Sequence, residues 1–327
     1  MSTVGAPLVS IVMPVHNAGR WLRASLDSVF AQTHRPLEIL AVDDGSTDDT
    51  SGILAEYATR HADVMRVVSL PTPTGASAAR NRGLLEVTGA YVKFLDADDL
   101  LSPDHVALQV AALAAHPGRI AHSEWSRFYS DPTEARFTPR PGWHDSGRPV
   151  DWICETWADA EPMYQCGMFL IPRELLARAG GWNEELSLID DFEFFTRLIL
   201  ASEGIAHTPG AHLHYRSGLP GSLSSRKSRR AWESAHRSVR LACEHLLARE
   251  DSPRTRRAAA DACQNLVHSL YPDHPDLVAD LLAEVRRLGG SRLRPDGGRV
   301  FKILTRMLGW RAALRIRRRR ESSRAAA

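Results

Sequence analysis

The sequence predicts an α/β fold in which helices flank a central, mostly parallel sheet and a helical C-terminal region follows. Short apolar runs alternate with helical segments over the first hundred residues, as in parallel strands joined by crossover helices. The composition, 43% hydrophobic and 24% charged, is that of a globular protein. The length of 327 residues suits one large domain with an appendage. A disordered, collagen-like or disulfide-stapled chain is therefore excluded.

Four strands are expected in the first hundred residues. Each is an apolar run that ends at polar or turn-forming residues. They cover residues 8–15, 37–42, 64–70 and 91–95. Strands that alternate with helices pair in parallel, so their carboxyl ends should meet at one edge of the sheet.

Helices are expected between these strands, because apolar residues there repeat at helical spacing. They cover residues 20–31, the segment after residue 46, and residues 75–88. Ser46 and Asp49 have the spacing of a helix-opening cap, and the Ser-Pro-Asp run at 102–104 predicts the start of a further helix.

The second half of the chain is less regular at first. Periodicity is lost over residues 120–164, which are rich in proline, glycine and arginine, and we expect a functional excursion from the sheet there. Regular structure resumes with a strand over 168–171 and helices over 172–179 and 190–201, and the chain is helical again from about 225 to 288. These limits predict three parts, residues 1–224, 225–298 and 299–327.

Acidic residues mark the ends of two predicted strands. Asp43 and Asp44 follow one, and Asp96, Asp98 and Asp99 follow another. Ligands of open α/β sheets bind at this edge, and carboxylate oxygens without neighbouring His or Cys suit Mn²⁺ or Mg²⁺. The chain lacks a G-x-x-x-x-G-K-[ST] loop and has no G-x-G-x-x-G motif after the first strand. This argues against a P-loop NTPase and against a dinucleotide-dependent dehydrogenase.

Six motifs in order resemble the landmarks of the family 2 inverting glycosyltransferases, which have the GT-A fold of nucleotide-diphospho-sugar transferases. They are VSIVMPVHN (9–17), VDDGSTDDT (42–50), GASAARNRG (75–83), FLDADD (94–99), GGWNEEL (180–186) and DDFEFFTRL (190–198). The resemblance covers about residues 8–224. It implies metal-assisted transfer of a sugar from a nucleotide-diphosphate donor, most simply a UDP-sugar, to a hydroxyl of a glycan or lipid-linked glycan in polysaccharide biosynthesis.

The resemblance also implies roles for residues that match its motifs. Those expected to bind the donor are Pro14, His16, Asp43, Arg80 and Asp96. Asp96 and Asp98 form the D-x-D motif and are expected at the metal ion, Mn²⁺ or Mg²⁺. Many relatives place a histidine where this chain has Gly218; His212 and His214 are the nearby histidines, but their spacing differs from the family's, so the third metal ligand stays open.

Asp191 matches the general base of the family. An inverting transfer needs one carboxylate to take the proton of the acceptor hydroxyl as that oxygen attacks the sugar. Phe194, Phe195 and the adjacent Asp190 are expected to raise the pKa of Asp191, the direction a base requires. Asp190 and Trp182 are expected to lie near the acceptor.

Four of the eight tryptophans lie in the irregular stretch, and two roles are open for them. They stack on acceptor sugar rings, or they fill the core because tryptophan buries a large area. The four are Trp125, Trp143, Trp152 and Trp157.

The charge divides unevenly along the chain. The net charge of +2 splits into −7 for residues 1–298 and +9 for residues 299–327. The last segment has the pattern of a basic amphipathic helix, which predicts peripheral binding to an anionic membrane surface; a helix docked on the body or a solvated extension is the alternative. With no apolar run of membrane-spanning length and no paired cysteines, we expect a cytoplasmic protein at the inner face of the membrane, without nucleic acid as a partner.

Two other functions remain open at this point. A nucleotidyltransferase would share the sheet architecture, but it would need a basic, glycine-rich triphosphate loop that HNAGRW (16–21) does not supply. A catalytically idle binding or scaffold protein of the same fold is disfavoured by the intact Asp96, Asp98 and Asp191 and mildly favoured by Gly218.

Overall fold

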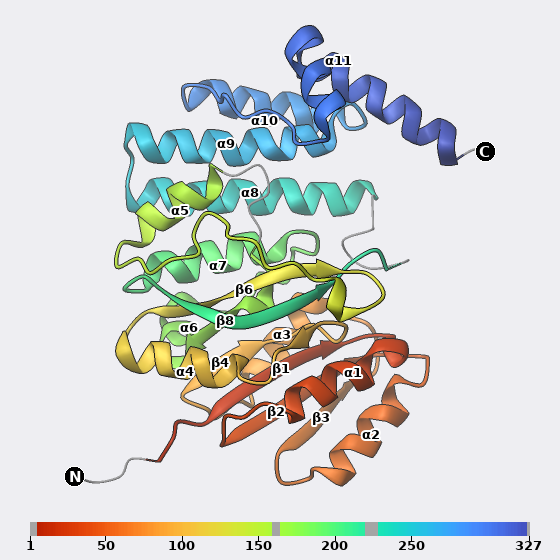
Figure 1. Ribbon diagram of the computed structural model, residues 1–327, viewed down its shortest axis with the longest axis vertical. Helices are drawn as coiled ribbons and strands as arrows, with labels where there is room; N and C mark the ends of the chain where they lie inside the picture. The colour runs from red at the N-terminus through yellow and green to blue at the C-terminus, as the bar shows by residue number, and fades with distance from the viewer. Residues whose placement is uncertain (1–4, 159–163, 220–227, 326–327) are drawn as a thin grey trace.

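The computed structural model describes residues 5–158, 164–219 and 228–325, with side chains up to residue 320. Within these residues an eight-stranded sheet with strand order β3-β2-β1-β4-β7-β6-β8-β5 is covered by helices, and a stack of helices continues from it to the C-terminus (Figure 1). The predicted α/β class and the helical C-terminal region are confirmed.

The first half of the sheet is parallel, as expected. Its strands are β1 (Val9–Val15), β2 (Leu37–Asp44), β3 (Met65–Leu70) and β4 (Tyr91–Phe94). They pair in parallel, and their crossover helices are α1 (Gly19–Phe30), α2 (Thr50–Arg60) and α3 (Ala76–Leu84). Helix α2 begins later than the predicted cap at Ser46, because the Ser46 amide and the Ser51 hydroxyl both donate to Asp43. The loop after β2 is thereby folded onto the strand end before the helix starts.

The second half of the sheet is mixed and differs from the prediction. Strand β7 (Phe169–Pro172) is antiparallel to β4 and to β6 (Ile120–Phe128), β6 is parallel to β8 (Ile205–Arg216), and the short β5 (Leu100–Leu101) closes the edge. The expected excursion from the sheet over 120–164 is wrong at its start, since β6 belongs to the sheet. Polar residues inside β6 and β8 obscure the apolar pattern of both strands. In the folded protein several of these polar groups hydrogen-bond across the strand pair; the Thr208 hydroxyl, for example, donates to the His122 carbonyl.

Among the described residues, four further helices and two 3₁₀ turns connect the strands of the second half. The helices are α4 (His105–Ala115), α5 (Pro149–Trp157), α6 (Arg173–Ala179) and α7 (Asp190–Ala201), and the 3₁₀ turns are Pro132–Glu134 and Cys166–Met168. Three of the tryptophans in question, Trp125, Trp152 and Trp157, are at most 2% exposed. For these three the core role holds, because a ring without exposed surface cannot stack on a sugar.

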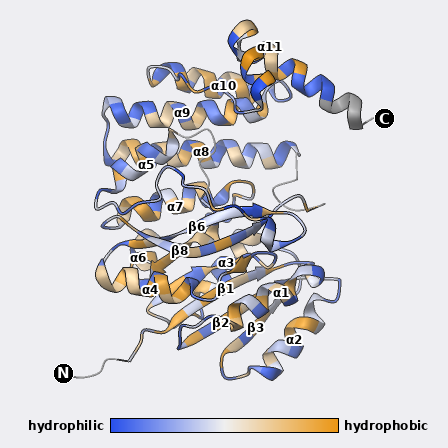
Figure 2. Cartoon of the chain, viewed as in Figure 1, coloured by the Kyte–Doolittle hydropathy of each residue, from blue (hydrophilic) through white to orange (hydrophobic). Residues whose placement is uncertain are grey.

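The C-terminal helices stack on α7 in chain order: α8 (Arg229–Arg249), α9 (Pro253–Leu270), α10 (Pro275–Arg287) and α11 (Arg299–Ala325). Figure 2 shows apolar and polar residues alternating around them, as expected for helices that bury one face. One hydrophobic core runs without a break from β1 through α7 to α8, α9, α10 and Leu314. All four cysteines are free, and none of the described helices is long and apolar enough to cross a membrane.

Candidate active site

The parallel strands bring the predicted donor residues to one edge of the sheet. Val15 pairs with Asp43 in register, so Pro14 and His16 lie beside the end of β2. The His16 ring nitrogen Nδ1 is 2.7 Å from the Asp44 carbonyl oxygen. Strand β4 lies on the other side of β1, which places the D-x-D segment next to them.

The two acids after β2 have different partners. Asp43 accepts hydrogen bonds from the Ser46 amide at 3.1 Å and the Ser51 hydroxyl at 2.6 Å. Asp44 accepts from the Thr74 amide, the Thr74 hydroxyl and the Gly75 amide at 2.7–2.8 Å. Asp44 therefore fixes the loop before α3 to the end of β2, a structural role.

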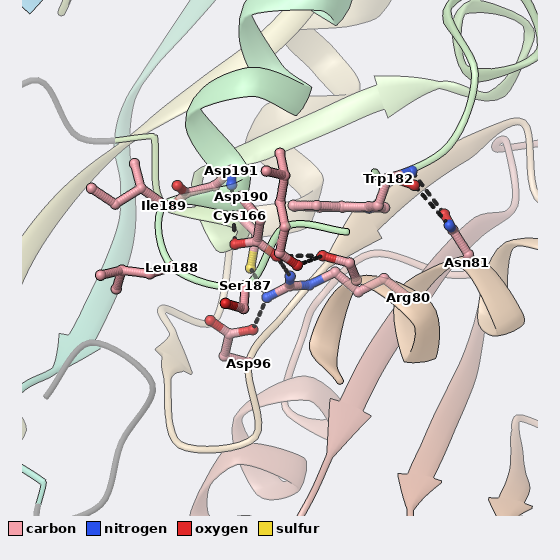
Figure 3. A network of polar contacts seen from close by, with 12 residues as sticks. Arg80, Asn81, Asp96, Cys166, Trp182, Ser187, Leu188, Ile189, Asp190 and Asp191 are labelled. Atoms are coloured by element: carbon pink, nitrogen blue, oxygen red, sulfur yellow. Dashed lines mark hydrogen bonds and ion pairs between the residues drawn. The ribbon is translucent and has the colours of Figure 1, made fainter. Parts of the chain in front are cut away.

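Arg80 of α3 lies at the centre of the site, where it joins two acids from distant parts of the chain (Figure 3). Its Nη2 is 2.8 Å from Asp96 Oδ1, and its Nη1 is 2.9 Å from Asp190 Oδ2. The guanidinium stacks on the Trp182 ring at 4.3 Å from the centroid. Burial by itself lowers the pKa of Arg80, but the charges of Asp96 and Asp190 outweigh it and raise that pKa, so the side chain stays charged.

Asp190 and Asp191 open α7 and differ in what they contact. Asp190 accepts from the Ser77 hydroxyl at 2.7 Å, from Arg80 and from the Asp191 amide at 3.1 Å. Among the described residues, no side chain hydrogen-bonds to the Asp191 carboxylate. Asp190 is thus anchored by other side chains, and the Asp191 carboxylate beside it is not.

The pKa of Asp191 is shifted in the direction expected for a base. Burial raises it first and the charge of Asp190 second, to about 8, against the opposing charge of Arg80. For Asp190, burial raises the pKa, and Arg80 and Ser77 pull it back down. The two adjacent carboxylates therefore have different partners and different electrostatic surroundings.

Trp182 is a buried residue of the site. The residue is 4% exposed, one face packs on Phe194 with ring centroids 3.9 Å apart, and Arg80 covers the ring as well. The ring packs against Arg80 and Phe194, and its predicted contact with the acceptor stays a prediction.

The D-x-D segment fits a divalent cation that shares its ligands with a diphosphate. No side chain of the described residues hydrogen-bonds to the Asp98 carboxylate, and Asp99 Oδ2 is buried without a partner. Burial, then the charge of Asp96, raises the pKa of Asp98 to about 7, a shift that a bound cation would reverse. The described residues contain no cluster of three or more Asp, Glu, His or Cys side chains arranged for a metal ion.

Neither candidate histidine joins the D-x-D acids in such a cluster. His212 Nε2 is 3.0 Å from Glu124, and His214 Nδ1 is 3.3 Å from the Pro132 carbonyl. Gly218 has a positive φ of 78°, and a Cβ there would lie 3.0 Å from the Tyr129 ring. A histidine at position 218 would therefore be strained as well as crowded.

Two residues of the site were not identified from the sequence. Arg216, at the end of β8, donates its amide to Asp99 Oδ1 at 2.9 Å and its Nε to the Asp98 carbonyl at 3.0 Å, with its guanidinium between the Trp21 and Phe128 rings. Ser77 holds Asp190. The Tyr215-Arg216 pair was the available signal for the first, and no local pattern marks the second.

Comparison with known proteins covers the β1, β2, α3 and D-x-D segments of this site. Residues 10–179 match the family model described as glycosyl transferase family 2. The chain is 33% identical over 120 residues to glycosyltransferase GlyA of Streptococcus pneumoniae, covering 37% of this chain and 17% of that protein. It is 30% identical over 304 residues to the O-antigen biosynthesis protein RfbC of Myxococcus xanthus, covering 86% of this chain and 22% of that protein. The chain thus spans about a fifth of the length of these curated relatives.

Two solved structures share the fold at low sequence identity. TarS of S. aureus (residues 1–349, with UDP-GlcNAc) has a TM-score of 0.60 at 18% identity, with 87% of this chain and 93% of that chain covered. The mannosyltransferase PcManGT of Pyrobaculum calidifontis, with GDP-Man and Mn²⁺, has a TM-score of 0.55 at 20% identity, with 96% and 87% covered. These similarities establish the GT-A fold of the chain.

Proposed function

Because the chain belongs to glycosyl transferase family 2, we propose that it is an inverting glycosyltransferase that moves one sugar from a nucleotide-diphosphate donor to a hydroxyl of a glycan or lipid-linked glycan. The observation that carries the proposal is the pair of carboxylates at the start of α7. Asp190 is bound by Ser77 and Arg80, and Asp191 is left free at the sheet edge that holds the D-x-D acids.

Asp191 acts as the general base in this proposal. Its carboxylate takes the proton of the acceptor hydroxyl while that oxygen attacks the sugar carbon from the face opposite the diphosphate. Asp190 and Arg80 orient α7 and keep charge balanced around the base. One carboxylate suffices, because inversion proceeds in a single displacement without a covalent intermediate.

The donor is proposed to bind at the sheet edge formed by β1, β2 and β4. In this proposal Asp43, with Pro14 and His16 beside it, receives the base of the nucleotide, since a carboxylate that accepts from loop donors can still accept from a pyrimidine N–H. A uridine donor is proposed on this ground and on the UDP-GlcNAc bound to TarS. Mn²⁺ or Mg²⁺ held by Asp98 and Asp96 would neutralise the charge of the departing diphosphate.

A donor panel tests the function. The full chain is incubated with Mn²⁺, a lipid-linked or oligosaccharide acceptor mixture and UDP-, GDP- and dTDP-sugars, and nucleoside diphosphate release is measured. We expect release from a UDP-sugar that stops when EDTA removes the metal ion. The variant Asp98→Asn should abolish release, and Asp104→Asn, which changes an exposed carboxylate at the start of α4, should not. No release from any donor would refute the proposal.

The acceptor is proposed to be a membrane-associated glycan, as for a polysaccharide biosynthesis enzyme. Support comes from the M. xanthus relative, named an O-antigen biosynthesis protein, and from the first half of α11. This half carries four large apolar residues that are 53–76% exposed, Val300, Ile303, Met307 and Leu308. The exposed cations Arg299, Lys302 and Arg306 lie on the adjoining face of the helix.

The second half of α11 packs on the body. Beyond a break at Gly309, where φ is 77°, Leu314 is fully buried and the Trp310 ring contacts His268 and Tyr271 edge-on. The second half of α11 is therefore a helix docked on the body, which was one of the alternatives for residues 299–327. It also holds the exposed first half at a fixed place on the surface, where apolar and basic side chains match the interface of an anionic leaflet.

Vesicle sedimentation tests the membrane proposal. The double variant Ile303→Asp, Met307→Asp should reduce binding to phosphatidylglycerol vesicles at least about tenfold, because two apolar side chains no longer enter the interface and two negative charges face the lipid. The control is Leu85→Asp, which alters a residue that is 80% exposed outside α11. Equal binding by the double variant and the wild type, or equal wild-type binding to neutral vesicles, would contradict membrane attachment through α11.

A further inference from the structure

The turn before α7 has an unusual backbone. Ile189, which directly precedes the two acids, has φ 62° and ψ 30°, the left-handed region. This conformation is a genuine outlier for a β-branched residue, and it persists only where surrounding structure holds it. Figure 3 shows residues 187–189 leading into Asp190 and Asp191 beside Arg80. The direction in which α7 begins depends on this turn.

Two serines of α8 hold the turn. Ser234 Oγ accepts hydrogen bonds from the Ser187 amide at 2.7 Å and the Leu188 amide at 3.2 Å, and it lies 3.3 Å from the Leu188 carbonyl, to which it donates. Ser238 Oγ donates to the Ile189 carbonyl at 2.5 Å. One hydroxyl can make one donor and two acceptor contacts, so Ser234 uses its full capacity on this turn.

The serines lie on the face of α8 that packs against α7. They are four residues apart, hence one above the other on the helix, and they are 7% and 0% exposed. Further along the same face, His245 Nε2 is 3.1 Å from Glu193, whose carboxylate also pairs with Arg197 as expected from their spacing. The α7–α8 contact thus adds specific polar bonds to its apolar packing, and these bonds fix register where apolar packing alone would allow sliding.

We propose that Ser234 and Ser238 are positioning residues for the general base. They keep the 187–189 turn in its left-handed conformation, so that Asp190 reaches Ser77 and Arg80 and the Asp191 carboxylate stays free at the site. The inference rests on the proposed function of Asp191. It makes α8, which lies outside the D-x-D half of the fold, a functional part of the active site.

The expected effect is on kcat. If the start of α7 rotates or shifts, the Asp191 carboxylate loses its alignment with the acceptor hydroxyl. A misplacement of about 1 Å can lower the rate by up to about 100-fold. The donor edge at β1, β2 and β4 makes no hydrogen bond with either serine among the described residues. Ser238→Ala and Ser234→Ala should therefore lower kcat by about 10- to 100-fold and leave the donor KM unchanged.

The matched control is Cys243→Ala. It also removes one buried heavy atom from α8, but Cys243 faces α9, where its sulfur lies 3.9 Å from Cys263 and 3.7 Å from the Ala259 carbonyl. It should keep wild-type kcat. A second test is rescue: Ile189→Asn, added to Ser238→Ala, should restore much of the lost kcat, because asparagine adopts the left-handed region readily and needs less external support.

Hydrogen exchange of the peptide containing residues 187–191 reports on the turn without any turnover. We expect faster exchange of the Ser187 and Leu188 amides in Ser234→Ala, since these amides lose their acceptor. Wild-type kcat in both serine variants, or equal loss of kcat in Cys243→Ala, would overturn the positioning role. Absence of donor turnover in the wild type would refute the proposed function itself, a result that the panel distinguishes from a defect confined to the serine variants.

Discussion

Replacing Asp191 by asparagine is expected to reduce sugar transfer by about 100- to 10,000-fold while leaving nucleotide binding intact. The amide has the shape of the carboxylate but cannot take the proton of the acceptor hydroxyl. The proposed donor site lies at the edge formed by β1, β2 and β4, so the affinity for UDP and metal should not change. Initial rates of nucleoside diphosphate release and UDP binding by calorimetry measure the two effects separately.

Stability distinguishes the roles of the two adjacent acids. Asp191→Asn replaces a partly buried carboxyl group that has no hydrogen-bonding side chain and whose ionised form is disfavoured by burial and by Asp190, so its melting temperature should equal or exceed that of the wild type. Asp190→Asn breaks the ion pair with Arg80 and should melt earlier. Near wild-type turnover in Asp191→Asn would contradict its role as the base.

Replacing Arg80 by methionine should give the largest loss of stability. Methionine keeps apolar contact with Trp182 but leaves Asp96 and Asp190 without their shared cation in a buried setting. Removing one partner of a buried ion pair typically costs about 3–5 kcal/mol. Urea unfolding of the full chain measures the free energy of unfolding, and transfer activity should be lost as well, because Asp190 then no longer fixes α7 in place.

Arg82 supplies the control for this measurement. It lies two residues further along α3 and pairs with Glu86 at the surface, with 37% of its side chain exposed. Exposed ion pairs contribute about 0–1 kcal/mol, so Arg82→Met should unfold close to the wild type. If the two variants unfold at the same urea concentration, the three-residue ion cluster is not what stabilises this part of the protein.

The parallel half of the fold could be predicted because its signals are local. Strands β1, β2, β3 and β4 are short, mostly apolar runs that end at polar or turn-forming residues, and such runs indicate burial directly. The acids after β2 and β4 could be placed together for the same reason, since parallel strands present their carboxyl ends at one edge. Helix α7 was predicted with its observed limits, because its apolar residues and the two acids before them follow helical spacing.

Strands β6 and β8 could not be predicted, because their polar residues become compatible with a buried strand only through partners elsewhere. The Glu124 carboxylate meets His212 across the pair, and Asp99 receives the Arg216 amide. Neither partner is near in sequence, so periodicity within β6 or β8 carries little of this information. The burial of Trp182 could not be predicted either, since a tryptophan beside a motif looks the same in sequence whether it faces a ligand or the core.

The sequence by itself determined the fold class, the strands of the parallel half and the edge at which acids gather, because these follow from hydrophobic patterning along short segments. Tertiary structure alone decided how the acids differ. Asp96 and Asp190 lie 94 positions apart in the chain and share Arg80, and the turn before Asp191 is held by serines of α8. A carboxylate takes its pKa and orientation from the groups around it, and those groups come together only when the chain has folded.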